Sequence, residues 1–314
     1  MKTVPLGKSA LQSSRLAYGG WRLASPSETV QVTPEREERG KAAVIAAFEA
    51  GFTLFDLADI YSDGASERIF GSALKDVAGM RNKVLIATKC GIRKAGQPEP
   101  NAPHRYDFSK EHILRSCDES LERMGIDTID LYQLHRPDFL CDPAEVASAF
   151  TQLKEQGKVR EFGVSNFRPS QVTVLQSACP MPLVANQIEI SLAQIAPFLD
   201  GTLDHCLLTG MTPIAWSPLA GGRLGTGARV SMQDNDHAHR QKVHDAMDLL
   251  ARERGVDRSQ IAIAWLLRHP SGIVPIVGTT NPERIALAAN ADNIELTREE
   301  WYRLFEAAYG QRLP

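Results

Sequence analysis

The chain alternates short, strongly apolar runs with longer helix-like segments along almost its whole length. Most of the apolar runs lack the polar–apolar alternation of a strand with one wet face, which is typical of parallel strands buried on both faces. Parallel neighbours need crossover connections, so the pattern predicts a parallel sheet with right-handed crossovers. Eight runs are candidate strands: Arg15–Gly19, Thr53–Asp56, Val84–Lys89, Ile129–His135, Glu161–Ser165, Leu183–Glu189, Thr212–Trp216 and Ile273–Val277.

The intervening segments carry helix start and stop signals. Ser109 is a candidate N-cap, and glycines follow the segments that end at Ala50, Met124 and Gln156. The predicted helices are Glu35–Ala50, Ser66–Val77, Ser109–Met124, Pro143–Gln156, Pro169–Ala178, Arg258–Arg268, Pro282–Ala289 and Glu299–Ala308. With no linker of low complexity, the pattern predicts one α/β domain over residues 1–314. We expect a (β/α)8 TIM barrel with a short N-terminal hairpin and additional C-terminal helices; a doubly wound open sheet is the alternative.

Composition narrows the class of partner. The formal net charge of −3 argues against nucleic acid and against an anionic membrane surface, because both require clustered Lys and Arg. The start, Met1–Gly7, lacks the apolar core of a signal peptide, and no apolar run is long enough to span a bilayer. The five cysteines are widely spaced without a CxxC pair, which favours reduced thiols over zinc or disulfides. We therefore expect a cytoplasmic protein that binds neither membrane nor nucleic acid.

Four polar residues stand at or just beyond the ends of neighbouring predicted strands. Asp56 ends the second strand, Lys89 the third and His135 the fourth, and Tyr61 follows Asp56 by five residues. Neighbouring strands lie about 4.8 Å apart, so their carboxyl ends would bring the four side chains together. A buried lysine and a buried aspartate are costly unless they pair.

Such a cluster suits proton transfer. A tyrosine has a pKa of about 10, and an adjacent ammonium is expected to lower it, while the aspartate holds the ammonium in place. A nearby histidine can orient or polarise a carbonyl oxygen. Each residue alone has an ordinary explanation. Asp56 could cap a helix or form an ion pair, and Tyr61 could be a half-buried aromatic residue. Lys89 could extend its ammonium to the solvent at the rim, and His135 could be a core histidine with its hydrogen bonds satisfied. Their joint position at three adjacent strand ends favours catalysis.

The segment Gly51–Tyr61 resembles the signature of the aldo-keto reductase family around its catalytic Asp and Tyr. Lys89 and His135 match the other two members of the family's catalytic tetrad, and Gly157–Phe167 resembles the second signature. The resemblance runs in order from near residue 6 to near residue 290 and is greatest to a bacterial branch of short-tailed reductases. It implies a monomeric enzyme that transfers a hydride from NADPH to an aldehyde or ketone, with Tyr61 as the proton donor.

The resemblance also places the cofactor. Ser165, Asn166 and Gln187 would hold the nicotinamide carboxamide, whose donor and acceptor these side chains can match. Trp216 would stack on the nicotinamide ring, although a core Trp is the ordinary reading. The remaining cofactor contacts implied are Gly20, Trp21, Ser217, Leu219, Arg223, Gly278, Thr279, Thr280 and Arg284.

The nucleotide end departs from the family pattern. Relatives often carry Lys or Arg at positions 278–280, where this chain has Gly, Thr and Thr, and Leu287 and Ala288 replace a Glu-Asn pair. Arg284 matches the position that contacts the adenosine 2′-phosphate, which favours NADPH over NADH. A helix N-terminus after Gly278 suits an anion, and no GxGxxG follows the first strand, which argues against a Rossmann domain.

Two other functions compete with the reductase. One is a nicotinamide-binding sensor or regulatory subunit built on the same barrel. The other is a metal-dependent hydrolase, which lacks support because His237 and His239 fall in a predicted polar loop, Asp234–Arg240, so no metal site is expected. The candidate apolar walls of the substrate pocket are Trp21, Phe55, Ile92 and Trp216. The short tail Gly310–Pro314 predicts an open, permissive site.

Overall fold

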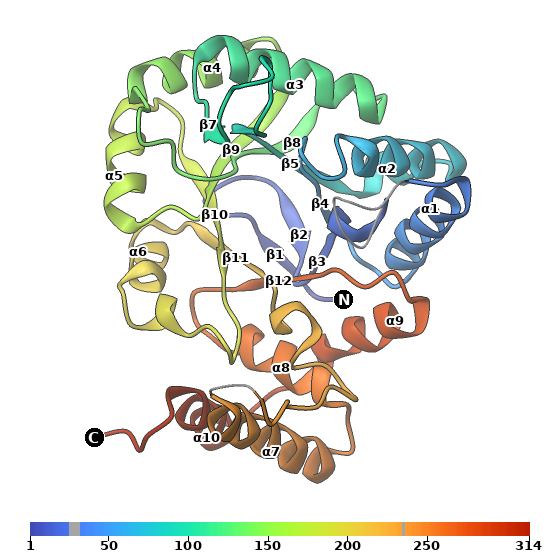
Figure 1. The fold of residues 1–314 in the computed structure, drawn as a ribbon, viewed down its shortest axis with the longest axis vertical. Helices are drawn as coiled ribbons and strands as arrows, with labels where there is room; N and C mark the ends of the chain where they lie inside the picture. Colours follow the sequence, from blue (N-terminus) through green and yellow to red (C-terminus); the bar gives the residue numbers. More distant parts are fainter. Residues whose placement is uncertain (25–31, 234–235) are drawn as a thin grey trace.

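The computed structural model describes residues 1–24, 32–233 and 236–314. Within them, eight parallel strands follow one another around a closed barrel, and the last pairs with the first (Figure 1). The predicted (β/α)8 barrel is confirmed, and the open-sheet alternative is wrong because this sheet has no free edge. The barrel strands are β3 (Ala17–Gly19), β4 (Leu54–Asp56), β5 (Leu85–Cys90), β8 (Ile129–Leu134), β9 (Val159–Ser165), β10 (Leu183–Glu189), β11 (Thr212–Trp216) and β12 (Val274–Val277).

Helices surround the barrel in Figure 1, and their ends follow the expected caps. Ser109 accepts a hydrogen bond from the backbone of His112, and Gly125 ends the same helix in a left-handed conformation. The helices are α1 (Pro34–Glu49), α2 (Ala65–Asp76), α3 (Lys110–Met124), α4 (Pro143–Glu155), α5 (Pro169–Ala178), α6 (Thr202–Thr209), α7 (His237–Arg254), α8 (Arg258–Leu267), α9 (Pro282–Asn290) and α10 (Arg298–Tyr309).

The predicted N-terminal hairpin is present as β1 (Thr3–Pro5) and β2 (Gln12–Ser14). Its turn places Leu6 in the barrel interior, fully buried among apolar side chains of the strands. The backbone amide of Gly7 donates to Thr212 at the start of β11, and that of Ser14 donates to Thr53 just before β4, both at 2.7 Å. The hairpin therefore closes the N-terminal end of the barrel, and the opposite end remains for a site.

Side chains of β4 alternate between the two faces of the barrel wall. Leu54 belongs to the interior cluster, whereas Phe55 packs outward against the rings of Tyr18 and Phe70 at 5.9 and 5.2 Å. The expectation that Phe55 lines the substrate pocket is therefore wrong. Asp56 has the same parity as Leu54, which directs its carboxylate inward.

Two helices were not predicted. α6 is a short helix between two left-handed glycines, and α7 packs with α10 in a layer outside α8 (Figure 1). α7 is polar over most of its surface and buries a narrow stripe that includes Val243, Met247 and Leu250. Its first residue is His237, so the assignment of His237 and His239 to a loop is wrong; Asp234 of that loop lies outside the described residues. Among the described residues, none of the helices combines the length and the hydrophobicity that a membrane span requires.

Candidate active site

The barrel brings together the four polar residues expected to meet at the strand ends. The Nζ of Lys89 lies 2.8 Å from Oδ2 of Asp56 and 3.3 Å from the phenol oxygen of Tyr61. The same ammonium donates to the carbonyl oxygen of Leu57 at 2.7 Å. The rings of Tyr61 and His135 meet edge to face, with centroids 5.8 Å apart. One ammonium therefore joins a carboxylate to a phenol, beside an imidazole.

Burial sets the protonation states of this cluster. Burial raises the pKa of Tyr61. Lys89 lowers that pKa, as expected, but by less than burial raises it, so the net pKa lies above its usual value. Burial alone would lower the pKa of Lys89, but Asp56 and Tyr61 outweigh it and raise that pKa above its usual value. Burial, reinforced by the charge of Lys89, holds the pKa of His135 well below its usual range. Near neutral pH the cluster holds a neutral phenol, a charged ammonium and a neutral imidazole.

A second polar group lies at the ends of β9, β10 and β11. Nδ2 of Asn166 donates to Ser165 at 2.9 Å and to the carbonyl oxygen of His135 at 3.2 Å. The indole of Trp216 donates to Oδ1 of Asn166 at 3.0 Å. Asn166 has φ of 62°, a left-handed conformation that turns the chain sharply where β9 ends. The residues expected to hold a carboxamide thus lie side by side, next to His135.

Gln187 joins the two groups, a contact that the sequence did not predict. Its Nε2 donates to Oδ1 of Asp56 at 2.7 Å, across 131 residues of sequence. The carbonyl oxygen of Gln187 also accepts from the hydroxyl of Ser165 at 3.0 Å. Both oxygens of Asp56 lie 2.8 Å from Nζ of Lys89, and Oδ1 also accepts from Gln187, so one carboxylate holds both residues.

Two segments are expected to bind the phosphates, one directly after β11 and one directly after β12. They start side by side, because β11 pairs with β12. After β11, Ser217 adopts φ of 50°, and the exposed Arg223 donates from Nε to the carbonyl oxygen of Ala220 at 3.0 Å. The expected cofactor contacts on the segment after β11 are Ser217, Leu219 and Arg223.

After β12, the backbone opens toward the N-terminus of α9. A Cβ built on Gly278 would meet no atom within 4 Å, and Asn281 caps the helix by accepting from the backbone amide of Arg284. Thr279 and Thr280 are partly exposed, and Arg284 is exposed. This region would suit a phosphate-bearing cofactor. It offers open space over a glycine, the N-terminus of a nine-residue helix and an arginine side chain. The residues present therefore fit a nicotinamide dinucleotide.

Gly20 and Trp21 begin the short helix η1 (Gly20–Arg22), directly after β3. A Cβ on Gly20 would lie 2.4 Å from Cδ2 of Leu57 and 3.4 Å from the carbonyl oxygen of Asp56, so a larger residue here would displace the Leu57 side chain. The Trp21 side chain is 45% exposed, with the guanidinium of Arg22 5.5 Å from its ring centroid. It is available at the rim of the site rather than buried beneath it.

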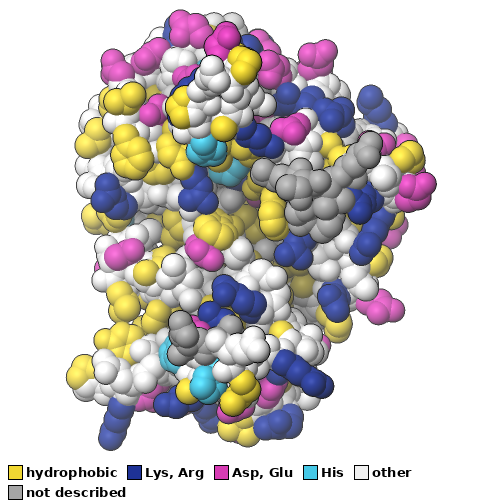
Figure 2. Space-filling model, viewed as in Figure 1, with side chains coloured by type: hydrophobic (Ala, Val, Ile, Leu, Met, Phe, Trp, Pro, Cys, Tyr) yellow, Lys and Arg dark blue, Asp and Glu magenta, His cyan; other side chains and the backbone are white. Residues whose placement is uncertain are grey.

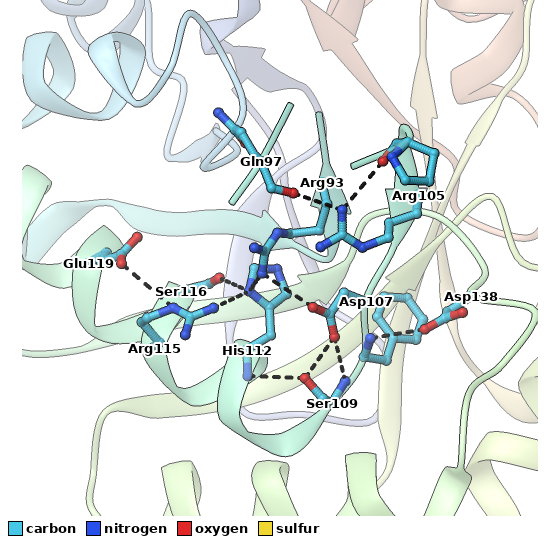
Figure 3. Close-up of polar contacts among 12 residues, drawn as sticks. Arg93, Gln97, Arg105, Asp107, Ser109, His112, Arg115, Ser116, Glu119 and Asp138 are labelled. Atoms are coloured by element: carbon cyan, nitrogen blue, oxygen red, sulfur yellow. Dashed lines mark hydrogen bonds and ion pairs between the residues drawn. The ribbon is translucent and has the colours of Figure 1, made fainter. Parts of the chain in front are cut away.

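The predicted loop after β5 contains a small hairpin, β6 (Ile92–Arg93) and β7 (Arg105–Tyr106). Arg93 ties it to α3, because its guanidinium contacts Asp107 at 3.2 Å and Nδ1 of His112 at 3.3 Å (Figure 3). Burial lowers the pKa of His112 to about 4, so this imidazole is a neutral acceptor. The amide of Phe108 donates to Asp138 at 3.0 Å, which links the hairpin to the loop that follows His135. Figure 2, in the same view as Figure 1, shows histidine and hydrophobic side chains beside a recess in the surface that faces the viewer.

Known proteins match this chain in sequence over nearly its whole length. The sequence profile of the aldo/keto reductase family matches residues 15–308. The chain is 40% identical to a 6-dehydroglucose reductase of Agrobacterium fabrum, over 96% of this chain and 97% of that one. It is 37% identical to the oxidoreductase YdhF of Escherichia coli over the full length of both.

Solved structures share the fold. The thermostable aldo-keto reductase Tm1743, determined with the inhibitor epalrestat, superimposes with a TM-score of 0.83 at 27% identity and covers 98% of this chain and all of that one. The glycerol dehydrogenase AKR11B4 of Gluconobacter oxydans gives 0.84 at 25% identity, with coverage of 99% and 97%. On the sequence match and the barrel together, this chain belongs to the aldo/keto reductase family and is an oxidoreductase that acts on carbonyl groups.

Proposed function

We propose that this enzyme reduces aldehydes and ketones to alcohols with NADPH as the reductant and Tyr61 as the general acid. The bound nicotinamide supplies a hydride to the carbonyl carbon. Ser165, Asn166 and Gln187 would hold its carboxamide, and Trp216 its ring. The side chains of Ser165, Asn166 and Trp216 are already joined by hydrogen bonds next to His135, and the hydroxyl of Ser165 contacts the backbone of Gln187. Arg284 and the open backbone at Gly278 would bind the phosphates.

The chain's own part of the reaction is a proton transfer. Tyr61 carries its proton at neutral pH and donates it to the carbonyl oxygen as that oxygen becomes an alkoxide. Lys89, held by Asp56, stabilises the phenolate left behind until solvent returns the proton. The neutral ring of His135 lies beside the phenol and orients the same oxygen. The contact that carries this proposal is the one between Lys89 and Tyr61.

A panel of carbonyl compounds with NADPH and with NADH tests the proposal. The first substrate is 6-dehydroglucose, since a relative 40% identical to this chain carries that name, followed by simple aldehydes and ketones. We expect NADPH oxidation that depends on the carbonyl compound and on Tyr61. We also propose that the active species is a single-domain monomer, which light scattering on the purified protein tests. Binding of NADPH without oxidation by any carbonyl compound would favour the sensor function instead.

A further inference from the structure

Three left-handed residues follow Tyr61 directly. Ser62, Asp63 and Gly64 have φ of 48°, 52° and 78°, and the first two are not glycine. Such residues are strained and persist only where the surrounding structure holds them. The loop that carries the phenol therefore needs an anchor outside itself.

Glu67 provides that anchor in the first turn of α2. Its side chain is fully buried, with Oε1 accepting from the hydroxyl of Thr88 and Oε2 from Nε of Arg123, both at 2.6 Å. Thr88 precedes Lys89 in β5, so one end of this contact lies on the strand that carries the ammonium. The other end reaches α3 through Arg123.

Arg123 also touches the loop itself. A Cβ on Gly64 would fall 2.4 Å from Cδ of Arg123, so the arginine side chain packs directly against the glycine that follows the two strained residues. The backbone amide of Ser66 donates back to the carbonyl oxygen of Tyr61 at 3.4 Å, which couples the start of α2 to the tyrosine. Arg123, Glu67 and Thr88 thus form a continuous connection between the Tyr61 loop and the Lys89 strand.

We infer that Glu67 is a positioning residue that sets the distance between Tyr61 and Lys89. This inference rests on the proposed function and adds a residue that touches neither substrate nor cofactor. Glu67 holds Thr88 on one side and Arg123 on the other, so its loss frees both ends of the connection. The strained loop then relaxes, and the phenol moves away from the 3.3 Å contact with the ammonium.

The test compares Glu67→Gln with Asp130→Asn. Asp130 is also a fully buried carboxylate between arginines, with Arg81 at 3.1 Å and Arg160 at 3.0 Å, but it lies near the opposite end of the barrel. Both variants weaken a buried ion pair, so both should lower the melting temperature. We expect kcat to fall on the order of tenfold to a hundredfold in Glu67→Gln only, because small misplacements of a reacting group are that costly. Its Kd for NADPH should stay within about threefold of wild type.

A second readout does not depend on activity. Tyrosine labelled with ¹³C at Cζ alone gives one NMR signal for each of the six tyrosines, and the Tyr61→Phe spectrum assigns that of Tyr61. The signal should shift in Glu67→Gln and stay in place in Asp130→Asn. Should Glu67→Gln fail to fold, Thr88→Val removes the same hydrogen bond at constant shape and should change kcat and the signal in the same direction.

The results separate the two proposals. An unchanged kcat and an unmoved Tyr61 signal in Glu67→Gln, or equal losses of kcat in both variants, would overturn the positioning role. Wild-type protein that reduces no carbonyl compound would instead refute the proposed function. In that case the NMR comparison still decides whether Glu67 positions Tyr61.

Discussion

Replacing Lys89 with methionine tests the contact on which the proposed chemistry depends. The ammonium is fully buried, and it contacts Asp56, the carbonyl oxygen of Leu57 and the phenol of Tyr61. Methionine matches the length of the lysine stem up to Cε and removes the charged ammonium. The variant therefore loses the group that would stabilise the phenolate while the phenol itself remains.

The structure gives the size of the effect. A unit charge 3.3 Å from a phenolate contributes about 5 kcal/mol at an effective dielectric constant of about 20. The carboxylate of Asp56 beside the same ammonium offsets part of this, so about 2 to 3 kcal/mol remains for the transition state. That corresponds to a loss of about 30- to 160-fold in kcat. The buried, unpaired Asp56 would also cost about 3 to 5 kcal/mol of stability.

The assay is single-turnover reduction followed by NADPH fluorescence, with folding checked by circular dichroism. Adding Asp56→Asn to Lys89→Met removes the unpaired charge, and this double variant should regain stability but not kcat. Lys83→Met, at an exposed lysine of η2 (Met80–Lys83), is the matched control and should keep wild-type kcat. A Lys89→Met enzyme with kcat within about threefold of wild type would refute the electrostatic role of Lys89.

Two further predictions concern the cofactor and pH. Arg284→Ala should weaken NADPH binding about tenfold and leave NADH binding nearly unchanged, because one charge-assisted contact to the 2′-phosphate is lost; equal Kd changes for both nucleotides by Trp fluorescence would contradict this. Burial, then the like charge of Glu67, raises the pKa of Asp59 to about 8. The folded state then keeps a proton that the unfolded state releases near pH 4, so wild type loses stability from pH 4 to 8. Asp59→Asn should remove that loss and raise the melting temperature at pH 8 but not at pH 4; identical pH slopes in both proteins would count against a raised pKa.

The sequence was sufficient for the barrel and for the residues that gather at its open end. Asp56, Lys89 and His135 each follow a run of buried strand residues, and the carboxyl ends of parallel strands always meet on one side. The position of these three residues at strand ends was therefore enough to predict that their side chains lie close together. Tyr61 was within reach because it follows Asp56 after a short loop.

Other features needed the structure. Phe55 is apolar and next to Asp56, but alternation along β4 directs it outward, and in a strand buried on both faces composition does not reveal the side. Glu67 and Arg123 look like ordinary surface charges on helices. They lie 56 residues apart in sequence, and only the packing of α2 against α3 buries Glu67 and pairs it with the half-buried Arg123. α7 was missed because its buried stripe is narrow within a highly charged segment.

The comparison of wild type with Tyr61→Phe in single-turnover reduction, together with NADPH binding, decides whether Tyr61 is the proton donor. The phenylalanine keeps the ring and removes only the proton donor. We expect a loss on the order of a hundredfold to ten-thousandfold in the rate of carbonyl reduction, with the Kd for NADPH within about twofold of wild type. A Tyr61→Phe enzyme that reduces the same carbonyl compound at a rate close to wild type would contradict the assignment of Tyr61 as the general acid.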